Sequence, residues 1–192
     1  MRSTQPGRVG CGSCRKGLSP GVLRGPWRGR RVDGAAGRAR CRLTHREGST
    51  TLRLTSTDFQ DGGALAARHG KRFDNRVPQL ACSAVPADAG SLALSLVDTH
   101  PVARGYVHWL VDGIPPVDGE IAEDGGIRVG RELEAYAGPF PPAGTHDYVF
   151  TLYALDRSAP TAPPRTGLAS FLRLIDGHVL ATATLTGTFT ES

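Results

Sequence analysis

Alternation between apolar and polar side chains constrains this chain more than any other pattern in it. Residues 178–186 place Val179, Ala181, Ala183 and Leu185 at every second position, with threonine at two of the three positions between them and again at position 186. Successive side chains of a β-strand point to opposite faces, so this spacing predicts a strand with one buried face. Three further runs predict strands from their apolar, β-branched and aromatic residues: 92–97, 107–111 and 148–155.

One amphipathic helix interrupts these strands. Apolar residues recur at helical spacing between residues 168 and 175, after a proline-rich loop. Thr166 is suited to cap the N-terminus of this helix, and Gly177 is suited to end it. The stretches 58–79 and 113–147 are rich in turn residues and are expected to be dominated by loops, which in a compact domain are usually functional.

These elements predict the fold class. A chain of 192 residues with 25 glycines and 14 prolines suits one domain with many turns, and it argues against a helical bundle. We expect a mainly β fold over residues 49–192, an antiparallel β-sandwich-like domain with one or two short peripheral helices. Residues 1–48 are expected to form a disordered, basic, Gly- and Arg-rich N-terminal extension, because they lack any apolar periodicity.

The charge of the chain is unevenly divided between these two parts. The net charge is +5, but residues 1–48 hold eleven Arg and one Lys against one Asp and one Glu, a net +10. Residues 49–192 therefore carry 5 − 10 = −5. A mildly acidic domain repels phosphate backbones, so we expect no nucleic-acid partner.

The extension contains one pattern that resembles a metal site. Cys11, Cys14, Cys41 and His45 form C-x2-C, a gap, and then C-x3-H, which loosely has zinc-ligand spacing. Such spacings are often accidental, and the composition of the segment favours a tail, or a stretch upstream of the true start.

Targeting features are weak. No stretch approaches the roughly 18–20 consecutive apolar residues that a membrane helix needs, so we expect no transmembrane segment. The pair Arg30-Arg31 lacks the apolar run that follows it in an export signal. Cys82 alone lies in the expected domain, which is too few cysteines for a disulfide framework. A cytoplasmic location is therefore expected.

Polar residues gather around the expected strand ends and allow three interpretations. These polar residues are Asp98, His100, His108, His146 and Tyr148. Histidine and carboxylate side chains are common zinc ligands, but these lack the short helical spacing that makes a metal site specific. A His–Asp pair can serve a hydrolase, but no G-x-S-x-G nucleophile turn occurs. The third interpretation is a polar pocket that hydrogen-bonds an anionic or zwitterionic group.

Five ordered segments support the third interpretation, because together they resemble the phosphatidylethanolamine-binding proteins, in their bacterial, Raf-kinase-inhibitor-like branch. The family motifs are S-x-x-F-x-D-G-G, then S-P-x-L-x-W-x-x-V-P, D-P-D-A-P followed by H-W, G-P-x-P-P followed by H-R-Y-x-F, and G-H-V-L-A with G-T-Y. The matching segments are 55–63 (TSTDFQDGG), 77–86 (VPQLACSAVP), 91–109 (SLALSLVD to HW), 138–150 (GPFPPAGTHDYVF) and 177–189 (GHVLA and GTF). They cover about residues 52–190.

The resemblance implies a β-sandwich-like fold with a small anion pocket at one end. It implies binding without catalysis, so no catalytic residue, metal or cofactor is expected. The residues that it assigns to the ligand are Asp98, His100, His108, Gly138, Pro139, His146 and Tyr148.

The chain departs from the family pattern at several positions, and Thr99 replaces the first Pro of D-P-D-A-P. His100 stands where the second acid of D-P-D-A-P is expected, Asp147 replaces the Arg of H-R-Y, and Cys82 replaces the Trp of L-x-W. In an extended strand His146 and Tyr148 share one face, so Asp147 is expected to point away from the pocket.

The sequence therefore predicts a protein that binds a small phosphate-like anion or a phospholipid head group. The alternative is a regulatory protein-interaction module, like a kinase inhibitor, that recognises a phosphorylated or acidic segment of a partner. A hydrolase or a metal-binding protein ranks third. A homodimer is compatible with the sequence.

Overall fold

A computed structural model describes residues 51–123, 126–160 and 162–190, all of which belong to one compact unit, His45–Ser192. The expected N-terminal extension, residues 1–48, lies outside the described residues together with its C-x2-C and C-x3-H pattern.

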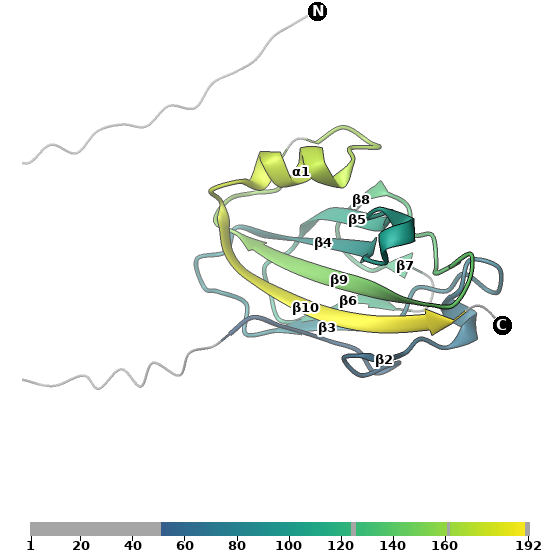
Figure 1. The fold of residues 1–192 in the computed structure, drawn as a ribbon. Helices are drawn as coiled ribbons and strands as arrows, with labels where there is room; N and C mark the ends of the chain where they lie inside the picture. Colours follow the sequence, from purple (N-terminus) through teal and green to yellow (C-terminus); the bar gives the residue numbers. More distant parts are fainter. Residues whose placement is uncertain (1–50, 124–125, 161, 191–192) are drawn as a thin grey trace, which may run out of the picture. The chain divides into compact units, whose positions relative to one another are not determined.

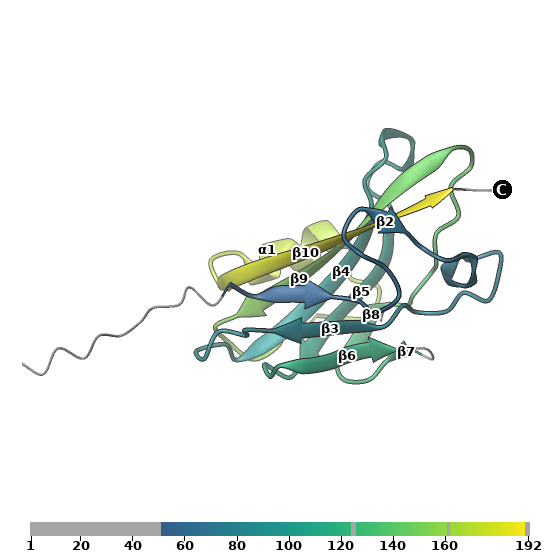
Figure 2. The same ribbon diagram turned by 90° about the horizontal axis from the view of Figure 1, so that it is seen from below.

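Two β-sheets face each other and form a sandwich (Figure 1). The larger sheet has the strand order β2-β10-β9-β4-β5-β8, and its neighbours are antiparallel except β2 and β10. Its strands are β2 (Gly63–Ala64), β4 (Ser91–Asp98), β5 (Val107–Ile114), β8 (Arg131–Glu134), β9 (Thr145–Leu155) and β10 (Val179–Thr190). The smaller, antiparallel sheet consists of β1 (Arg53–Thr55), β3 (Leu80–Ser83), β6 (Gly119–Glu123) and β7 (Gly126–Ile127), in that order (Figure 2).

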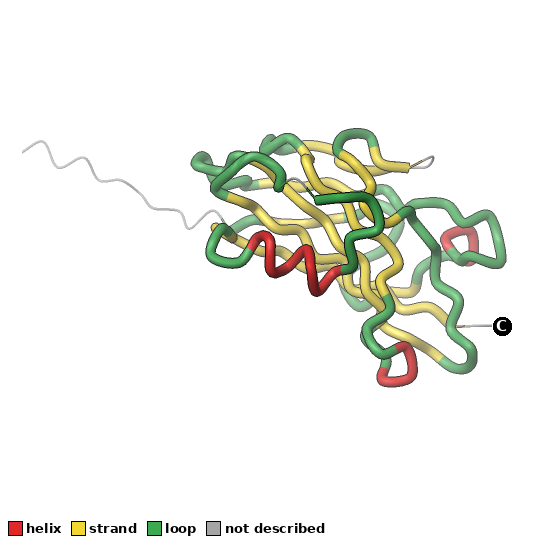
Figure 3. Tube along the Cα trace, turned by 90° about the horizontal axis from the view of Figure 1, so that it is seen from above, coloured by secondary structure: helices red, strands yellow, loops and turns green. Residues whose placement is uncertain are grey.

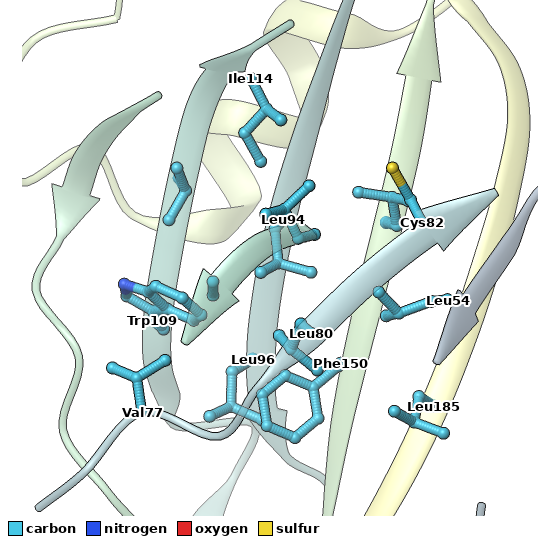
Figure 4. Close-up of a cluster of buried hydrophobic side chains, with 14 of the residues drawn as sticks. Leu54, Val77, Leu80, Cys82, Leu94, Leu96, Trp109, Ile114, Phe150 and Leu185 are labelled. Carbon is cyan, nitrogen blue, oxygen red and sulfur yellow. The ribbon is translucent and has the colours of Figure 1, made fainter. Parts of the chain in front are cut away.

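The main hydrophobic core lies between the two sheets. β4 presents Leu92, Leu94 and Leu96 to it, and all three are fully buried. Phe150 from β9 and Leu80 from β3 meet them, as Figure 4 shows for side chains of both sheets. At about 1.5–3 kcal/mol for each large apolar side chain that leaves water, this layer is the main source of the stability of the fold.

A second, smaller core lies on the outer face of the larger sheet, beneath the helix α1 (Leu168–Ile175). Phe171 and Ile175 of the helix pack there against Leu110, Leu155 and other residues of the sheet. β4 is therefore covered on both faces, which explains why its residues from Ser91 to Leu96 are all buried. The helix was expected here.

The ends of this helix match the expectation in part. Gly177 follows the helix with a φ of 75°, as a glycine that ends a helix does. The predicted N-cap is wrong: Gly167 occupies that position, with no side-chain cap. The Thr166 hydroxyl donates instead to the Pro163 carbonyl inside the proline-rich loop.

The four long strands that the sequence predicts are confirmed, and β9 is central. The alternation in β10 buries Leu185 and Phe189, but Val179, at the start of the strand and beside a register shift with β9, is 40% exposed. The stretch 113–147 is less dominated by loops than expected, since it contains β6, β7 and β8.

Two short 3-10 helices mark one end of the sandwich. They are η1 (Ala67–His69) and η2 (Pro101–Ala103), and Figure 3 shows both at the end where β10 finishes. β4 also finishes at this end, and β9 begins there, because the two strands are antiparallel. The functional residues suggested by the sequence come from these strand ends.

Candidate functional site

The sheet register brings four of the predicted residues together. Asp98, the last residue of β4, is paired with Tyr148 of β9, and His108 lies at the start of β5. His146 and Tyr148 are buried while Asp147 between them is exposed, so the predicted alternation of faces is confirmed. The result is a cluster of polar side chains that are each at most 3% exposed.

Asp98 and His146 form a buried pair at the centre of the cluster. Asp98 Oδ2 lies 2.7 Å from His146 Nδ1, and Asp98 Oδ1 accepts a 2.9 Å hydrogen bond from the backbone N–H of His100. A carboxylate only accepts hydrogen bonds, so Nδ1 of His146 carries the proton. The His100 ring stacks on the His146 ring, with 3.9 Å between centroids and an angle of 13°. His100 therefore contacts the cluster through its ring and its backbone.

His108 is held by a backbone carbonyl. Its Nδ1 lies 2.6 Å from Ala137 O, and a carbonyl also only accepts, so Nδ1 is the protonated nitrogen. Burial lowers the pKa of His108, although the bond to Ala137 and the charge of Asp98 oppose this effect. The ring contacts Tyr106, Phe140 and Tyr148 at centroid distances of 4.8, 5.2 and 5.1 Å.

The Tyr148 hydroxyl is fully buried and makes no hydrogen bond within the described residues. Its polar neighbours are Asp98 and the backbone of Phe140, but neither forms a hydrogen bond of ordinary geometry with it. Burial raises the pKa of Tyr148, and the negative charge of Asp98 raises it further. The group therefore stays protonated at neutral pH and is available as a donor.

A small cavity opens beside this cluster. It has a volume of about 140 Å³ and is lined by Asp98, Val102, Ala103, Tyr106, His108, Phe140 and Pro142. Larger hollows of about 700 and 490 Å³ lie elsewhere on the described surface. Charged residues of both signs line them, including the ion pair of Arg68 with Asp58 in the smaller of the two. The small cavity is the one where histidine, tyrosine and carboxylate side chains converge.

Of the seven residues assigned to the ligand, Asp98 and His108 line this cavity, whereas His100, His146 and Tyr148 lie behind them and Gly138 and Pro139 lie apart from it. The Gly138 N–H donates to Asn75 Oδ1 at 2.8 Å, and the Pro139 carbonyl accepts from the Lys71 N–H at 2.9 Å. Both backbone groups are thus bonded within the protein. They hold the segment that carries Phe140 against the loop after η1.

Sequence reasoning missed the apolar wall of the cavity. Tyr106 precedes His108 by two residues, the spacing at which side chains of an extended segment share a face, and this signal was available. Phe140 occupies the variable position of the G-P-x-P-P motif. Val102 and Ala103 belong to η2, which no pattern predicted.

The metal and hydrolase interpretations gain no support from the described residues. Within them, no three or more His, Cys, Asp or Glu side chains are arranged to hold a metal ion. Cys82 is buried in the main core, and burial raises the pKa of its thiol. No residue that lines the cavity is a serine, threonine or cysteine.

Comparisons with known proteins bear on the family of this chain. Residues 55–190 match the family profile described as phosphatidylethanolamine-binding protein. A UPF0098 protein of Methanothermobacter thermautotrophicus is 32% identical over 149 residues, which cover 72% of this chain and 98% of the relative. LppC of Mycobacterium tuberculosis, whose name marks it as a candidate lipoprotein, is 38% identical over 72% of each chain.

Two solved structures resemble the fold of this chain. A candidate phosphatidylethanolamine-binding protein homologue from Chlamydia trachomatis, CT736, superposes with a TM-score of 0.67 at 29% identity and covers 74% of this chain and 99% of its own. YbcL of Escherichia coli, at 23% identity, shares the fold with a TM-score of 0.66 over 73% of this chain and 99% of its own. Separately, none of the helices in the described part of the chain has the length and apolar character to cross a membrane.

Proposed function

Because the chain belongs to the phosphatidylethanolamine-binding protein family, we propose that its cavity binds a small phosphate-like anion or a phospholipid head group without chemical conversion. The proposed ligand contacts are His108, His146 and Tyr148. Asp98 and His100 orient the histidines, and Gly138 and Pro139 support the wall of the site.

The buried Tyr148 hydroxyl is the observation that carries this proposal. Leaving a buried hydroxyl without a partner costs about 1–3 kcal/mol, so such a group calls for an explanation. A phosphate oxygen is a strong acceptor and would satisfy it. Tyr148 does not itself line the cavity, but its ring contacts His108, which does, so an anion that reaches His108 lies close to Tyr148.

Asp98 is compatible with a nearby anion, because two hydrogen-bond donors already stabilise its carboxylate. Its oxygens accept from His146 and from the backbone of His100. Since Nδ1 of both His108 and His146 is committed, the Nε2 atom of each ring is the one left for a ligand. A protonated Nε2 donates to the anion, and a neutral Nε2 accepts from a ligand that carries its own proton.

A titration of the full chain tests this function. Phosphate and O-phosphorylethanolamine are added at constant pH and ionic strength while the ring signals of the six histidines are followed by NMR. Saturable shifts are expected for His100, His108 and His146. His178 is the internal control, because it pairs with Asp156 next to β10 and has no contact with the cluster. If no histidine shifts, or if His178 shifts as much as the others, the anion pocket is refuted.

The protein-interaction alternative rests on the exposed rim of the cavity. Val102 is 64% exposed and Tyr106 is 46% exposed, and both line its mouth. A partner segment that inserts a phosphorylated or acidic side chain would cover them. This function predicts weak binding of phosphate alone and much tighter binding of a phosphopeptide. A hydrolase, the third candidate, predicts turnover that His146→Ala abolishes.

The cytoplasm is the proposed location. Cys82 is a free, buried thiol, as a reducing compartment allows. The name of LppC describes that relative as a lipoprotein, and it suggests attachment to a membrane as the alternative location. Cell fractionation decides between them, since recovery of the protein in the membrane fraction would refute a cytoplasmic location.

A further inference from the structure

A single peptide group connects Asn75 to His108. The N–H of Gly138 donates to Asn75 Oδ1 at 2.8 Å, and the carbonyl of Ala137 accepts from His108 Nδ1 at 2.6 Å. These two groups belong to the same peptide bond, which is planar, so its N–H and carbonyl cannot turn independently. The side chain of Asn75 therefore fixes the direction of the carbonyl that holds the His108 ring.

The surrounding backbone packs closely around this peptide group, and Asn75 is the side chain that bonds its N–H. The Ala137 N–H donates to the His108 carbonyl at 2.8 Å, and the Tyr136 hydroxyl donates to the His69 carbonyl at 3.1 Å. A side chain at Gly138 would place its Cβ 2.0 Å from His69 O. The segment around residue 138 thus lies backbone against backbone on the loop that contains Asn75.

Asn75 has the conformation that this role requires. Its φ is 53°, in the left-handed region that asparagine and glycine adopt far more readily than other residues. Its own N–H donates to the Gly70 carbonyl at 3.1 Å, which closes the turn after η1. Glycine would tolerate this backbone equally well but would lack the acceptor oxygen. The conformation and the hydrogen bond are therefore separable by substitution.

We propose that Asn75 is a positioning residue for the pocket, and that it sets the ring orientation and the tautomer of His108 through the Ala137–Gly138 peptide group. Neutral imidazole has two tautomers, and a fixed acceptor at Nδ1 selects the form whose Nε2 faces the ligand with a lone pair. Hydrogen bonds in such a chain also strengthen one another. Without Asn75 the peptide group loses the bond that aligns its N–H, the Ala137 carbonyl holds His108 Nδ1 less well, and the Nε2–H tautomer gains population.

The effect on ligand affinity rests on the proposed anion pocket, whereas the effect on the His108 tautomer does not. The tautomer is measured in the full 192-residue chain by ¹⁵N NMR of labelled histidine, at a pH where His108 is neutral. Asn75→Gly is expected to shift the tautomer ratio toward Nε2–H by about 2- to 10-fold, the equivalent of one neutral hydrogen bond. Asn75→Asp keeps a side-chain acceptor and should restore the Nδ1–H form.

The neighbouring exposed residue supplies the control. Asp74→Ala alters the same loop, where the Asp74 side chain is 64% exposed, and should leave the His108 signals unchanged. If Asn75→Gly does not fold, Asn75→Ser removes the same acceptor, because the serine side chain is one bond shorter than that of asparagine and its hydroxyl does not reach the Gly138 N–H. The proposal is overturned if a folded acceptor-free variant keeps the His108 signals of the unaltered protein, or if Asn75→Asp behaves like Asn75→Gly.

Phosphate titrations of the same variants separate this proposal from the proposed function. Phosphate affinity should change by about 2- to 10-fold in Asn75→Gly and stay constant in Asp74→Ala. If the unaltered protein binds no phosphate, the proposed function fails, and the tautomer measurement still decides whether Asn75 positions His108.

Discussion

Replacing Tyr148 by phenylalanine should make the unliganded protein more stable and its anion binding weaker. The substitution removes one hydroxyl and keeps the ring, which contacts His108 at 5.1 Å and His146 at 6.4 Å between centroids. Most substitutions in a buried site destabilise the fold. An opposite sign is expected here because the removed group is buried and has no hydrogen-bond partner among the described residues.

The magnitude follows from the cost of that unpaired group. In the unfolded chain the hydroxyl is hydrated, and in the folded protein it has lost this hydration without compensation, at a cost of about 1–3 kcal/mol. Tyr148→Phe recovers part of this cost, so we expect the free energy of unfolding to rise by about 1–2 kcal/mol. A hydrogen bond to a charged ligand is worth about 1.5–3 kcal/mol, so phosphate affinity should fall by roughly 10- to 150-fold.

Urea unfolding with and without phosphate measures both effects. Tyr153→Phe is the matched control on the same strand, because the Tyr153 hydroxyl lies 3.3 Å from the Ser95 hydroxyl. Loss of that bond should lower stability by about 0.5–1.5 kcal/mol and leave phosphate binding unchanged. If Tyr148→Phe lowers the stability of the unliganded protein as Tyr153→Phe does, the hydroxyl has a partner in the protein and the reasoning is refuted.

Four further outcomes can be measured. His108→Ala and His146→Ala should each weaken phosphate binding by about 1–3 kcal/mol in calorimetry, and unchanged affinity in both would remove the pocket assignment. Because burial lowers the pKa of His108 below its usual 6.5, affinity for a phosphodiester head group should rise as the pH falls toward that lowered pKa. The same lowered pKa makes the stability of the unliganded protein depend on pH. The neutral His108 ring contributes stability that is complete above about pH 6.5 and is lost as the pH falls through the pKa of the folded state. Urea midpoints that stay constant from pH 8 to 5 would contradict a buried His108. Gly138→Ala should destabilise the fold by about 3 kcal/mol or more, because its Cβ would lie 2.0 Å from His69 O, and a normal thermal midpoint would contradict this contact.

The sequence predicted the long strands better than the short ones, because a period of two residues needs several repeats to be visible. β4, β5, β9 and β10 each span eight residues or more, and all four were predicted. β8 spans four residues and buries only Leu133, so it has no pattern to detect. β6 buries Ile121 and Ala122 in succession, beside a register shift in its pairing with β3. Irregular pairing of this kind depends on the neighbouring strand and has no local signal.

The site was predicted to the extent that it depends on strand register. Asp98, His108, His146 and Tyr148 lie at strand ends, and antiparallel pairing alone brings them to one place. The role of Asn75 depends instead on contact between two loop segments that are 63 residues apart in the sequence. Loop contacts of this range are set by tertiary packing, which neither periodicity nor spacing encodes.

The two departures from the family pattern beside the pocket act together, because they lie in segments that are bonded to each other. The Thr99 N–H donates to the Asp147 carbonyl at 3.0 Å, which places the His100 segment beside the start of β9. Relative to the pattern D-P-D-A-P and H-R-Y, the carboxylate moves from position 100 to position 147, where the side chain is exposed. An imidazole takes its place at position 100 and stacks on His146. A negative charge has thus left the interior side of these segments for the solvent side, where water screens it. This exchange favours an anion in the cavity, since Asp98 is then the one carboxylate among the described residues that line it, and two hydrogen bonds already stabilise Asp98.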